Sequence, residues 1–364
     1  MVPAYWRSSL HAPLLIAVLL ALGALAGRLD AAVVKVACVG DSITAGAGAS
    51  SAATAYPAQL ANLLGGGYTV GNFGHSGTTL LKNGDFPYWS VAEFASSDLF
   101  APDIVVIMLG TNDSKPQNWG GFSAQFPADY SDLIDHYRAL PSHPLVFCCL
   151  PCPVYGAGNF GITSPVVQTG VIPAILQVAG AKAVPLIDVN SALSGLPGDF
   201  PDNVHPNDAG YALLAQAVYG PIHPPVAVGG LSAQAVSADR IDLAWTDAAD
   251  NETGFTIERA PALAGPYLVI ASAAANAGSF SDTGLAANSP YFYRVSATNA
   301  AGSSSSVEAH ATTPGAVASA PGGSGAAASP QSRGCGAGGF SSSVMLLAVL
   351  ALLRLRSPVR SRSQ

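Results

Sequence analysis

The sequence predicts two domains of different fold class, an α/β domain with a parallel sheet followed by a small all-β sandwich. From Val33 to about His223, short β-branched runs alternate with segments of helical spacing. From Pro224 to Pro314, apolar residues recur at every second position and turn residues interrupt them. Strands that alternate with helices are typical of a parallel sheet covered by helices on both faces. The second pattern, over about ninety residues, is typical of one sandwich domain.

The strands and helices of the first domain are predicted from separate segments of the sequence. Five β-branched runs are expected to be strands: Val33–Val39, Tyr68–Phe73, Asp103–Leu109, Pro144–Leu150 and Ala183–Val189. Four segments have helical spacing: Tyr56–Leu64, Tyr130–Leu140, Val166–Val178 and Asn207–Tyr219. Because ligands bind beyond the carboxyl ends of the strands in such sheets, the polar residues that follow these runs are the candidates for a site.

The charge of the chain excludes one class of partner. Charged residues are 10% of the 364 residues, and the formal net charge is −7. An ordinary soluble domain has about 25% charged residues. Five of the arginines lie near the two ends, so the chain between them is more acidic still. An acidic body repels phosphate backbones, so no nucleic-acid partner is expected.

The N-terminus has the features of an export signal. Arg7 precedes an apolar run, Pro13 to Ala26, that ends in the small-residue pattern Ala24-Leu25-Ala26. These features predict a signal peptide over residues 1–26. The alternative is an anchor helix that stays in place, but the run is short for a membrane span.

The C-terminal end predicts a linker and a tether. Residues 315–339 are rich in Gly, Ala, Ser and Pro, which is typical of a flexible linker. Residues 340–364 contain the apolar run Val344–Leu353, followed at once by arginines. With Cys335 ahead of it, this tail resembles the sorting signals of some bacterial surface proteins. The alternative is a simple tail anchor with its positive end inside. Both predict an exported bacterial protein that is secreted or held at the cell surface or outer membrane.

Four further cysteines lie in or beside predicted strands: Cys38, Cys148, Cys149 and Cys152. Buried thiols or one disulfide are expected, with Cys149–Cys152 or Cys38–Cys148 as the pairs, since export permits a disulfide. The C-x-x-C spacing of Cys149 and Cys152 also fits metal or redox chemistry. We do not expect that chemistry, because no second cysteine pair accompanies it.

Three residues of the first domain suggest nucleophilic catalysis. Ser42 follows the first predicted strand in the segment Gly40-Asp41-Ser42. A serine hydroxyl is a poor nucleophile unless a base takes its proton, and His205 is the best candidate for that base. Asp202 precedes His205 by three residues in a turn, a separation that can bring its carboxylate to one nitrogen of the imidazole. The alternative is that these are ordinary turn residues and His205 lies on the surface.

Two other strand ends offer donors for a developing oxyanion. Gly77 lies in the loop after the second strand, where a glycine lets the backbone N–H approach a ligand closely. Asn112 follows the third strand and carries a neutral side-chain amide. An oxyanion needs fixed donors of this kind. Alternatively, Gly77 only turns a loop and Asn112 only caps a helix.

Taken together, the four blocks resemble the SGNH hydrolases, also called the GDSL esterase/lipase family. The blocks are Gly40 to Thr44, Asn72 to Thr78, Gly110 to Asp113, and Asp202 to Pro206. The resemblance implies a flavodoxin-like α/β/α fold over residues 33–222. It also implies a serine esterase that acts through an acyl-enzyme without metal or organic cofactor.

The resemblance assigns a role to each of the five residues. Ser42 would be the nucleophile, His205 the base and then the acid, and Asp202 the group that orients His205. The N–H groups of Ser42 and Gly77 and the side chain of Asn112 would form the oxyanion hole. A chain that only bound carbohydrate or acted as an adhesin, with an inactive hydrolase domain, would be expected to lose Ser42 or His205.

The substrate is less well indicated. The segments after the second and third blocks look like the branch of the family that includes carbohydrate and sialate O-acetylesterases. Tyr88, Trp89 and Trp119 are candidates for stacking on sugars. The alternative is that one or two of them pack the fold. The partner expected is therefore an acetylated carbohydrate or another small ester. A lipase or thioesterase of the same family is the alternative.

The second domain, residues 224–314, resembles a fibronectin type III domain. Trp245 lies on an early strand and Leu285 lies before a turn. Tyr291 stands where that fold places its tyrosine corner. The resemblance predicts a spacer or a binding module and implies no chemistry.

Overall fold

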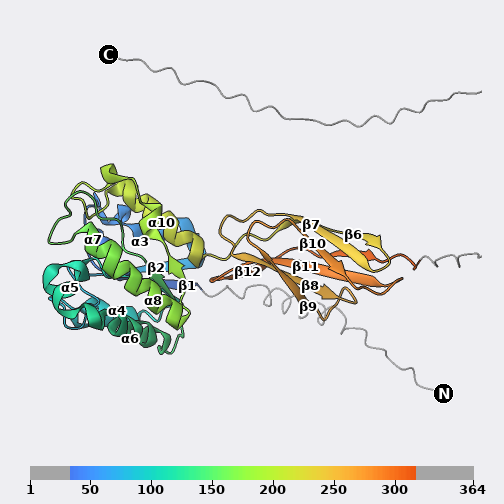
Figure 1. Ribbon diagram of the computed structural model, residues 1–364, viewed down its shortest axis with the longest axis horizontal. Coiled ribbons are helices and arrows are strands. Elements are labelled where there is room, and N and C mark those ends of the chain that lie inside the picture. Colours follow the sequence, from blue (N-terminus) through green and yellow to red (C-terminus); the bar gives the residue numbers. More distant parts are fainter. Residues whose placement is uncertain (1–32, 317–364) are drawn as a thin grey trace, which may run out of the picture. The chain divides into compact units, whose positions relative to one another are not determined.

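The computed structural model describes residues 33–316 and contains an α/β domain and an all-β sandwich (Figure 1). The fold class predicted from the sequence is confirmed for both. The predicted signal peptide, most of the linker and the C-terminal tail lie outside the described residues. The domain boundaries stay predictions: the last helix of the first domain ends at Ile222, and the first strand of the sandwich begins at Gly229.

A five-stranded parallel sheet forms the centre of the α/β domain. Its strand order is β2-β1-β3-β4-β5, the flavodoxin-like order. The strands are β1 Val34–Gly40, β2 Tyr68–Gly74, β3 Ile104–Met108, β4 Leu145–Cys149 and β5 Leu186–Ile187. The last strand is shorter than predicted, and only two of its residues pair with β4.

Helices cover both faces of this sheet (Figure 1). The longer ones are α3 Tyr56–Leu64, α4 Ala92–Leu99, α5 Pro116–Phe122, α6 Phe126–Arg138, α8 Ile172–Lys182 and α10 Asp208–Ile222. The short ones are α2 Ser42–Ala45, α7 Ser164–Val166 and α9 Val189–Ala192, and a π-helical turn, Val167–Val171, joins α7 to α8. The predicted segment Tyr56–Leu64 coincides with α3, and the other three segments of helical spacing overlap α6, α8 and α10. The helices α4 and α5 have no predicted counterpart.

The side chains of each strand alternate between two cores. Val36 and Cys38 of β1 pack with Leu60 of α3 and Leu214 of α10 on one face. Ala37 and Val39 pack on the other face with residues of α6 and α8. Because both faces are buried, the strands read as continuous apolar runs, which is why the sequence located them.

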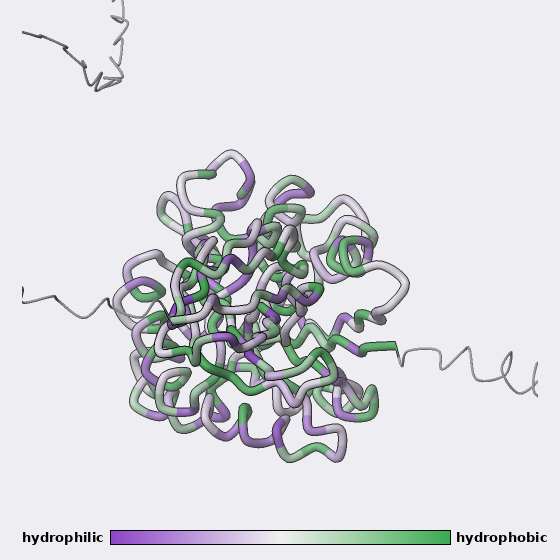
Figure 2. Tube along the Cα trace, turned by 90° about the vertical axis from the view of Figure 1, so that its right-hand side faces the viewer, coloured by the Kyte–Doolittle hydropathy of each residue, from purple (hydrophilic) through white to green (hydrophobic). Residues whose placement is uncertain are grey.

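The sandwich has a three-stranded and a five-stranded antiparallel sheet. Its strands are β6 Gly229–Ser237, β7 Arg240–Thr246, β8 Gly254–Ala260, β9 Leu268–Ala274, β10 Ser279–Thr283, β11 Pro290–Asn299, β12 Gly302–Ser305 and β13 Ala309–Thr312. Hydrophobic and hydrophilic residues interchange over short distances along the tube (Figure 2). Trp245 and Leu285 belong to the core. The Tyr291 hydroxyl accepts a hydrogen bond from the Ala286 N–H at 2.9 Å, as a tyrosine corner requires.

Candidate active site

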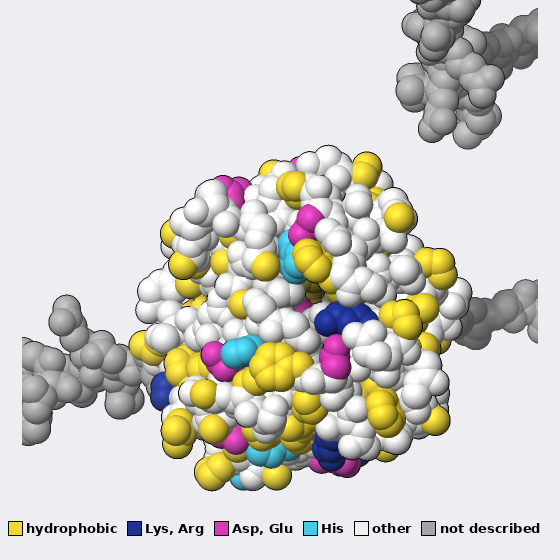
Figure 3. Space-filling model, turned by 90° about the vertical axis from the view of Figure 1, so that its left-hand side faces the viewer, with side chains coloured by type: hydrophobic (Ala, Val, Ile, Leu, Met, Phe, Trp, Pro, Cys, Tyr) yellow, Lys and Arg dark blue, Asp and Glu magenta, His cyan; other side chains and the backbone are white. Residues whose placement is uncertain are grey.

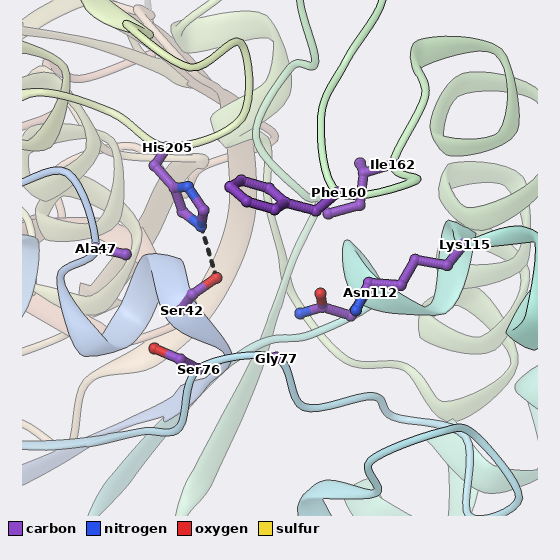
Figure 4. Close-up of a pocket in the computed structure, with 9 residues that line it drawn as sticks. All are labelled: Ser42, Ala47, Ser76, Gly77, Asn112, Lys115, Phe160, Ile162 and His205. Carbon is purple, nitrogen blue, oxygen red and sulfur yellow. Dashed lines mark hydrogen bonds between the residues drawn. The ribbon is translucent and has the colours of Figure 1, made fainter.

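The register of three neighbouring strands brings the candidate residues to one edge of the sheet. Gly40, the last residue of β1, pairs with Gly74 of β2 and Met108 of β3. The ends of these three strands are therefore level. Ser42, Gly77 and Asn112 follow those ends within a few residues, and all three line one pocket (Figure 4).

Ser42 is the first residue of α2. The Asp41 side chain caps this helix by accepting a hydrogen bond from the Ile43 N–H at 3.0 Å. A first-turn N–H has no partner within its own helix, so the N–H of Ser42 is left for a ligand. The side chain of Ser42 points toward His205 (Figure 4).

The turn that carries His205 is built around the Asp202 carboxylate. Its Oδ1 accepts hydrogen bonds from the N–H groups of Val204 at 3.0 Å and His205 at 2.7 Å. Its Oδ2 lies 2.7 Å from Nδ1 of His205, and Nε2 of the same ring lies 2.8 Å from Ser42 Oγ. The structure therefore joins Ser42, His205 and Asp202 in one hydrogen-bonded chain.

The environment keeps Asp202 ionised. Partial burial raises the pKa of its carboxyl, but the hydrogen bonds from the His205 N–H, the His205 ring and the Val204 N–H outweigh it. The net result is a pKa below the ordinary value of 3.8. An ionised carboxylate at Nδ1 favours the tautomer with its proton on Nδ1, which leaves Nε2 free to accept a proton.

Hydrogen bonds join the loop after Ser42 to α10, the helix that follows His205. The N–H and hydroxyl of Ser50 donate to the Asp208 carboxylate at 2.8 and 2.6 Å. The Tyr211 hydroxyl donates to the Ala47 carbonyl at 2.6 Å. Gly48 has φ +91°, and a Cβ there would lie 2.5 Å from the Pro206 carbonyl oxygen. These contacts hold Ser42 and His205 in place relative to each other.

The two remaining oxyanion candidates are also tied together. Gly77 has φ +86°, a conformation that favours glycine. The Asn112 side-chain amide donates to the carbonyl of Thr78, the next residue, at 3.1 Å, and lies 3.5 Å from Asp41 Oδ2. Both oxygens of the neighbouring Asp113 accept N–H groups of the same loop, from Leu80 and Leu81 at 2.9 and 2.8 Å. These contacts fix the two loops relative to each other.

Two buried carboxyl groups lie under the site. Burial raises the pKa of Asp41 to about 6, although the Ile43 N–H and His205 act in the opposite direction. Burial also raises the pKa of Asp113 to about 7, and the nearby Asp41 carboxyl adds to this. The hydrogen bonds that Asp113 receives only partly offset that rise.

The pocket has a volume of about 250 Å³. It is lined by Ser42, Ala47, Ser76, Gly77, Asn112, Lys115, Phe160, Ile162 and His205. On the face that Figure 3 shows, hydrophobic, histidine and lysine side chains gather around a hollow. Lys115 Nζ lies 3.8 Å from Asp85 Oδ2, and the Lys115 side chain is 14% exposed. Five of the lining residues were not predicted from the sequence: Ala47, Ser76, Lys115, Phe160 and Ile162.

None of the three aromatic residues proposed to stack on sugars lines this pocket. Tyr88 is fully buried and its hydroxyl donates to the Phe73 carbonyl at 2.7 Å. The indole N–H of Trp89 donates to the Leu80 carbonyl at 2.9 Å. Trp119 packs against the core, with its ring centroid 5.4 Å from that of Phe126. All three pack the fold, so that expectation is corrected.

The four described cysteines, Cys38, Cys148, Cys149 and Cys152, are free and buried. Burial raises the pKa of Cys38 to about 12 and of Cys148 to about 11. Thiols with such pKa values are poor nucleophiles. Of the two alternatives that the sequence left open, the structure has buried thiols. Within residues 33–316, no group of three or more His, Cys, Asp or Glu side chains could hold a metal ion.

Comparisons with known proteins agree with this geometry. Residues 38–213 match the model of the GDSL-like Lipase/Acylhydrolase family. An acetylxylan esterase from Xylanibacter ruminicola is 36% identical over 205 residues, which are 51% of this chain and 42% of that protein. The chain therefore spans less than half the length of that relative.

Solved structures also resemble each part. A carbohydrate acetylesterase family member from Sinorhizobium meliloti is 20% identical, with a TM-score of 0.42 over 51% of this chain and 95% of its own. A Fn3-like protein from Clostridium thermocellum is 31% identical, with a TM-score of 0.23 over 25% of this chain and 96% of its own. On the match of its family model, residues 38–213 of this chain are a domain of the GDSL-like lipase/acylhydrolase family.

Proposed function

We propose that this protein is an exported serine esterase that removes acetyl groups from carbohydrate. One observation carries the proposal. Ser42 Oγ lies 2.8 Å from His205 Nε2, and the Nδ1 of that ring lies 2.7 Å from the ionised Asp202 carboxylate. This is the arrangement that turns a serine hydroxyl into a nucleophile.

In the first half of the reaction, Ser42 Oγ attacks the ester carbonyl carbon while His205 Nε2 takes the hydroxyl proton. The carbonyl oxygen becomes an oxyanion, and the Ser42 N–H, the Gly77 N–H and the Asn112 amide donate to it. Each such donor contributes about 10²–10³ in rate. The intermediate then breaks its bond to the sugar oxygen, and the imidazolium returns the proton to that oxygen, leaving an acetyl group on Ser42.

In the second half, a water molecule attacks the acetyl carbon of the acyl-enzyme. His205 takes one proton from the water and then delivers it to Ser42 Oγ as the bond to the serine breaks. Acetate leaves and the hydroxyl of Ser42 is restored. Asp202 stabilises the imidazolium that forms in each half without taking its proton.

Two observations support a small acyl group on a sugar. The relative from Xylanibacter ruminicola is an acetylxylan esterase. The pocket of about 250 Å³ lies below the range of about 300–1,000 Å³ that is common for drug-sized ligands. Export and a surface tether are supported by the apolar segments at the two ends of the sequence.

The test compares p-nitrophenyl acetate, p-nitrophenyl octanoate and partially acetylated xylo-oligosaccharides as substrates of the full chain and of its Ser42→Ala variant. We expect release of acetate from the oligosaccharides, faster turnover of the acetate than of the octanoate, and loss of both in the variant. A preference for octanoate would instead indicate a lipase. Equal rates for the two proteins would remove Ser42 from the mechanism.

A further inference from the structure

Two exposed phenylalanine rings lie near the candidate site: Phe160 lines the pocket, and Phe86 lies next to Gly77, which also lines it. Phe160 is 59% exposed, and its ring centroid lies 5.6 Å from that of His205. Phe86 is 40% exposed, and its Cδ1 lies 3.7 Å from where a Cβ would stand on Gly77. One ring is therefore next to the base and the other is next to the oxyanion loop.

Phe86 is held rigidly although its ring is exposed. Its carbonyl accepts the Thr79 N–H at 2.8 Å. The preceding residue, Asp85, exchanges two hydrogen bonds with Asn118, at 2.8 and 2.9 Å. The ring meets His75 edge-on, with centroids 5.2 Å apart. A ring fixed in this way loses little conformational freedom when it binds a ligand.

Phe160 has an unfavourable backbone conformation. Its φ is +53°, in the left-handed region that non-glycine residues rarely adopt. The loop is closed by a hydrogen bond from the Ile162 N–H to the Asn159 carbonyl at 2.8 Å. Strain of this kind clusters at functional sites, and an exposed ring adds nothing to the core in return. The strained backbone places the Phe160 ring in the lining of the pocket, next to His205.

Polar groups complete the same rim. Lys115 points its amino group into the pocket (Figure 4). Its nearest carboxylate oxygen, Asp85 Oδ2, is 3.8 Å away and also accepts a hydrogen bond from the Gln117 side chain at 2.9 Å. A sugar ring presents apolar C–H faces and a rim of hydroxyl groups, so it matches aromatic rings combined with such donors and acceptors. An acyl chain has only C–H groups and leaves the polar groups unpartnered.

We propose that Phe86 and Phe160 stack on sugar rings of an oligosaccharide, on either side of the ester that faces Ser42. Lys115 and Asp85 then hydrogen-bond to the hydroxyl groups of the sugar. The proposal rests on the proposed esterase function and deepens it, since it makes a sugar chain, and not an isolated acetate ester, the preferred substrate.

Substitutions of similar size separate stacking from general apolar contact. Phe86→Leu and Phe160→Leu keep an apolar side chain but lose the aromatic face, whereas Phe86→Tyr and Phe160→Tyr keep the face. We expect each Leu variant to raise KM for the acetylated oligosaccharides about tenfold more than KM for p-nitrophenyl acetate. Each Tyr variant should stay within about threefold of wild type on the oligosaccharides. Leu99→Ala, at an 87% exposed position outside the pocket, is the control.

Two results would overturn the proposal. One is an equal loss on both substrates in the Leu variants, which indicates a structural role. The other is a gain on p-nitrophenyl octanoate in the Leu variants with oligosaccharide KM unchanged, which indicates an acyl site.

A binding titration separates this proposal from the esterase function. The Ser42→Ala protein is titrated with xylo-oligosaccharides that carry no acetyl group, with and without Phe160→Leu. Weaker binding with the Leu substitution supports stacking even if no ester is cleaved, in which case only the esterase function fails. Identical binding by the two proteins counts against stacking.

Discussion

The two domains differ in whether a buried carboxylate has a partner of opposite charge. In the sandwich, Asp282 receives two hydrogen bonds from Arg259 and one from the Tyr293 hydroxyl, so its charge is matched within the core. In the α/β domain, Asp41 forms no salt bridge with a described residue, and burial raises its pKa to about 6. Asp282 and its two partners in the sandwich therefore stabilise the fold. In the α/β domain the carboxylates lie beside the pocket instead, and there Asp202 contacts the imidazole of His205.

The largest effect is expected from Asp202→Asn, which removes the charge beside the His205 ring but keeps the shape of the side chain. Kcat on p-nitrophenyl acetate should fall about 10²–10⁴-fold, because a neutral amide no longer stabilises the imidazolium or fixes its tautomer. Asp132→Asn, in an exposed pair with Lys82, is the control and should retain wild-type kcat. Wild-type activity in Asp202→Asn would show that the carboxylate only shapes the turn.

Asn112→Ala removes one oxyanion donor and should rank next. We expect kcat to fall about 10²–10³-fold with little change in KM, since the contact forms only in the transition state. Asn83→Ala is the comparison, because Asn83 is exposed and bonds to Gln125. A rise in KM with kcat unchanged would mean that Asn112 contacts the bound substrate as strongly as the transition state.

Asp282→Ala, in the sandwich, is expected to lower stability and leave activity unchanged. Loss of the carboxylate leaves Arg259 and the Tyr293 hydroxyl without their partner, so the sandwich should lose about 2 kcal/mol in its free energy of unfolding. Thermal unfolding of the full chain measures this loss, and esterase activity at 25 °C should stay within twofold. Asp242→Ala, in the exposed pair with Arg240, should cost less. A large loss of activity in Asp282→Ala would contradict the separation of roles.

A dependence of stability on pH is also expected. Because the pKa values of Asp41 and Asp113 are raised in the fold, to about 6 and about 7, the folded state binds more protons than the unfolded one between about pH 4 and 7. The free energy of unfolding of the α/β domain should therefore fall as pH rises through this window, by at most about 1.4 kcal/mol per pH unit for each group.

Hydrogen exchange of peptides from the α/β domain at pH 5 to 7.5 measures this slope. Asp41→Asn should make it shallower. Asp208→Asn should leave it unchanged, because its hydrogen bonds with Ser50 lower the pKa of Asp208 and keep it ionised throughout. A slope of opposite sign in wild type would show that other groups dominate.

The sequence predicted the parts of this structure whose signals are local. Continuous apolar runs marked the strands, and the boundaries of α3 were predicted without error. Ser42, Gly77 and Asn112 follow the ends of β1, β2 and β3, and the level ends of these strands explain why the three converge. Asp202 and His205 lie in a turn after α9 and before α10, and a hydrogen bond joins His205 to Ser42.

The rim of the pocket was not predictable in the same way. Tyr88 and Phe86 are two residues apart, yet one is buried and the other exposed, because the Thr79 and Asp113 contacts set the path of that loop. Phe160 lies between Gly158 and Gly161, and the sequence does not show that this loop reaches His205. Lys115 follows Asn112 by three residues. Its place in the pocket depends on the direction of the turn between them, which the sequence does not show.

The contacts between the loop after Ser42 and the helix after His205 have a consequence for how the enzyme matures. Ser42 is joined to His205 across 163 positions, and Asp208 and Tyr211 of α10 hold the loop that follows the nucleophile. The nucleophile and the oxyanion donors come from the first part of the chain, but the base arrives with the last helix of the domain. A partly synthesised chain thus has no complete site, and ester cleavage is expected only after α10 has packed against the loop that follows Ser42.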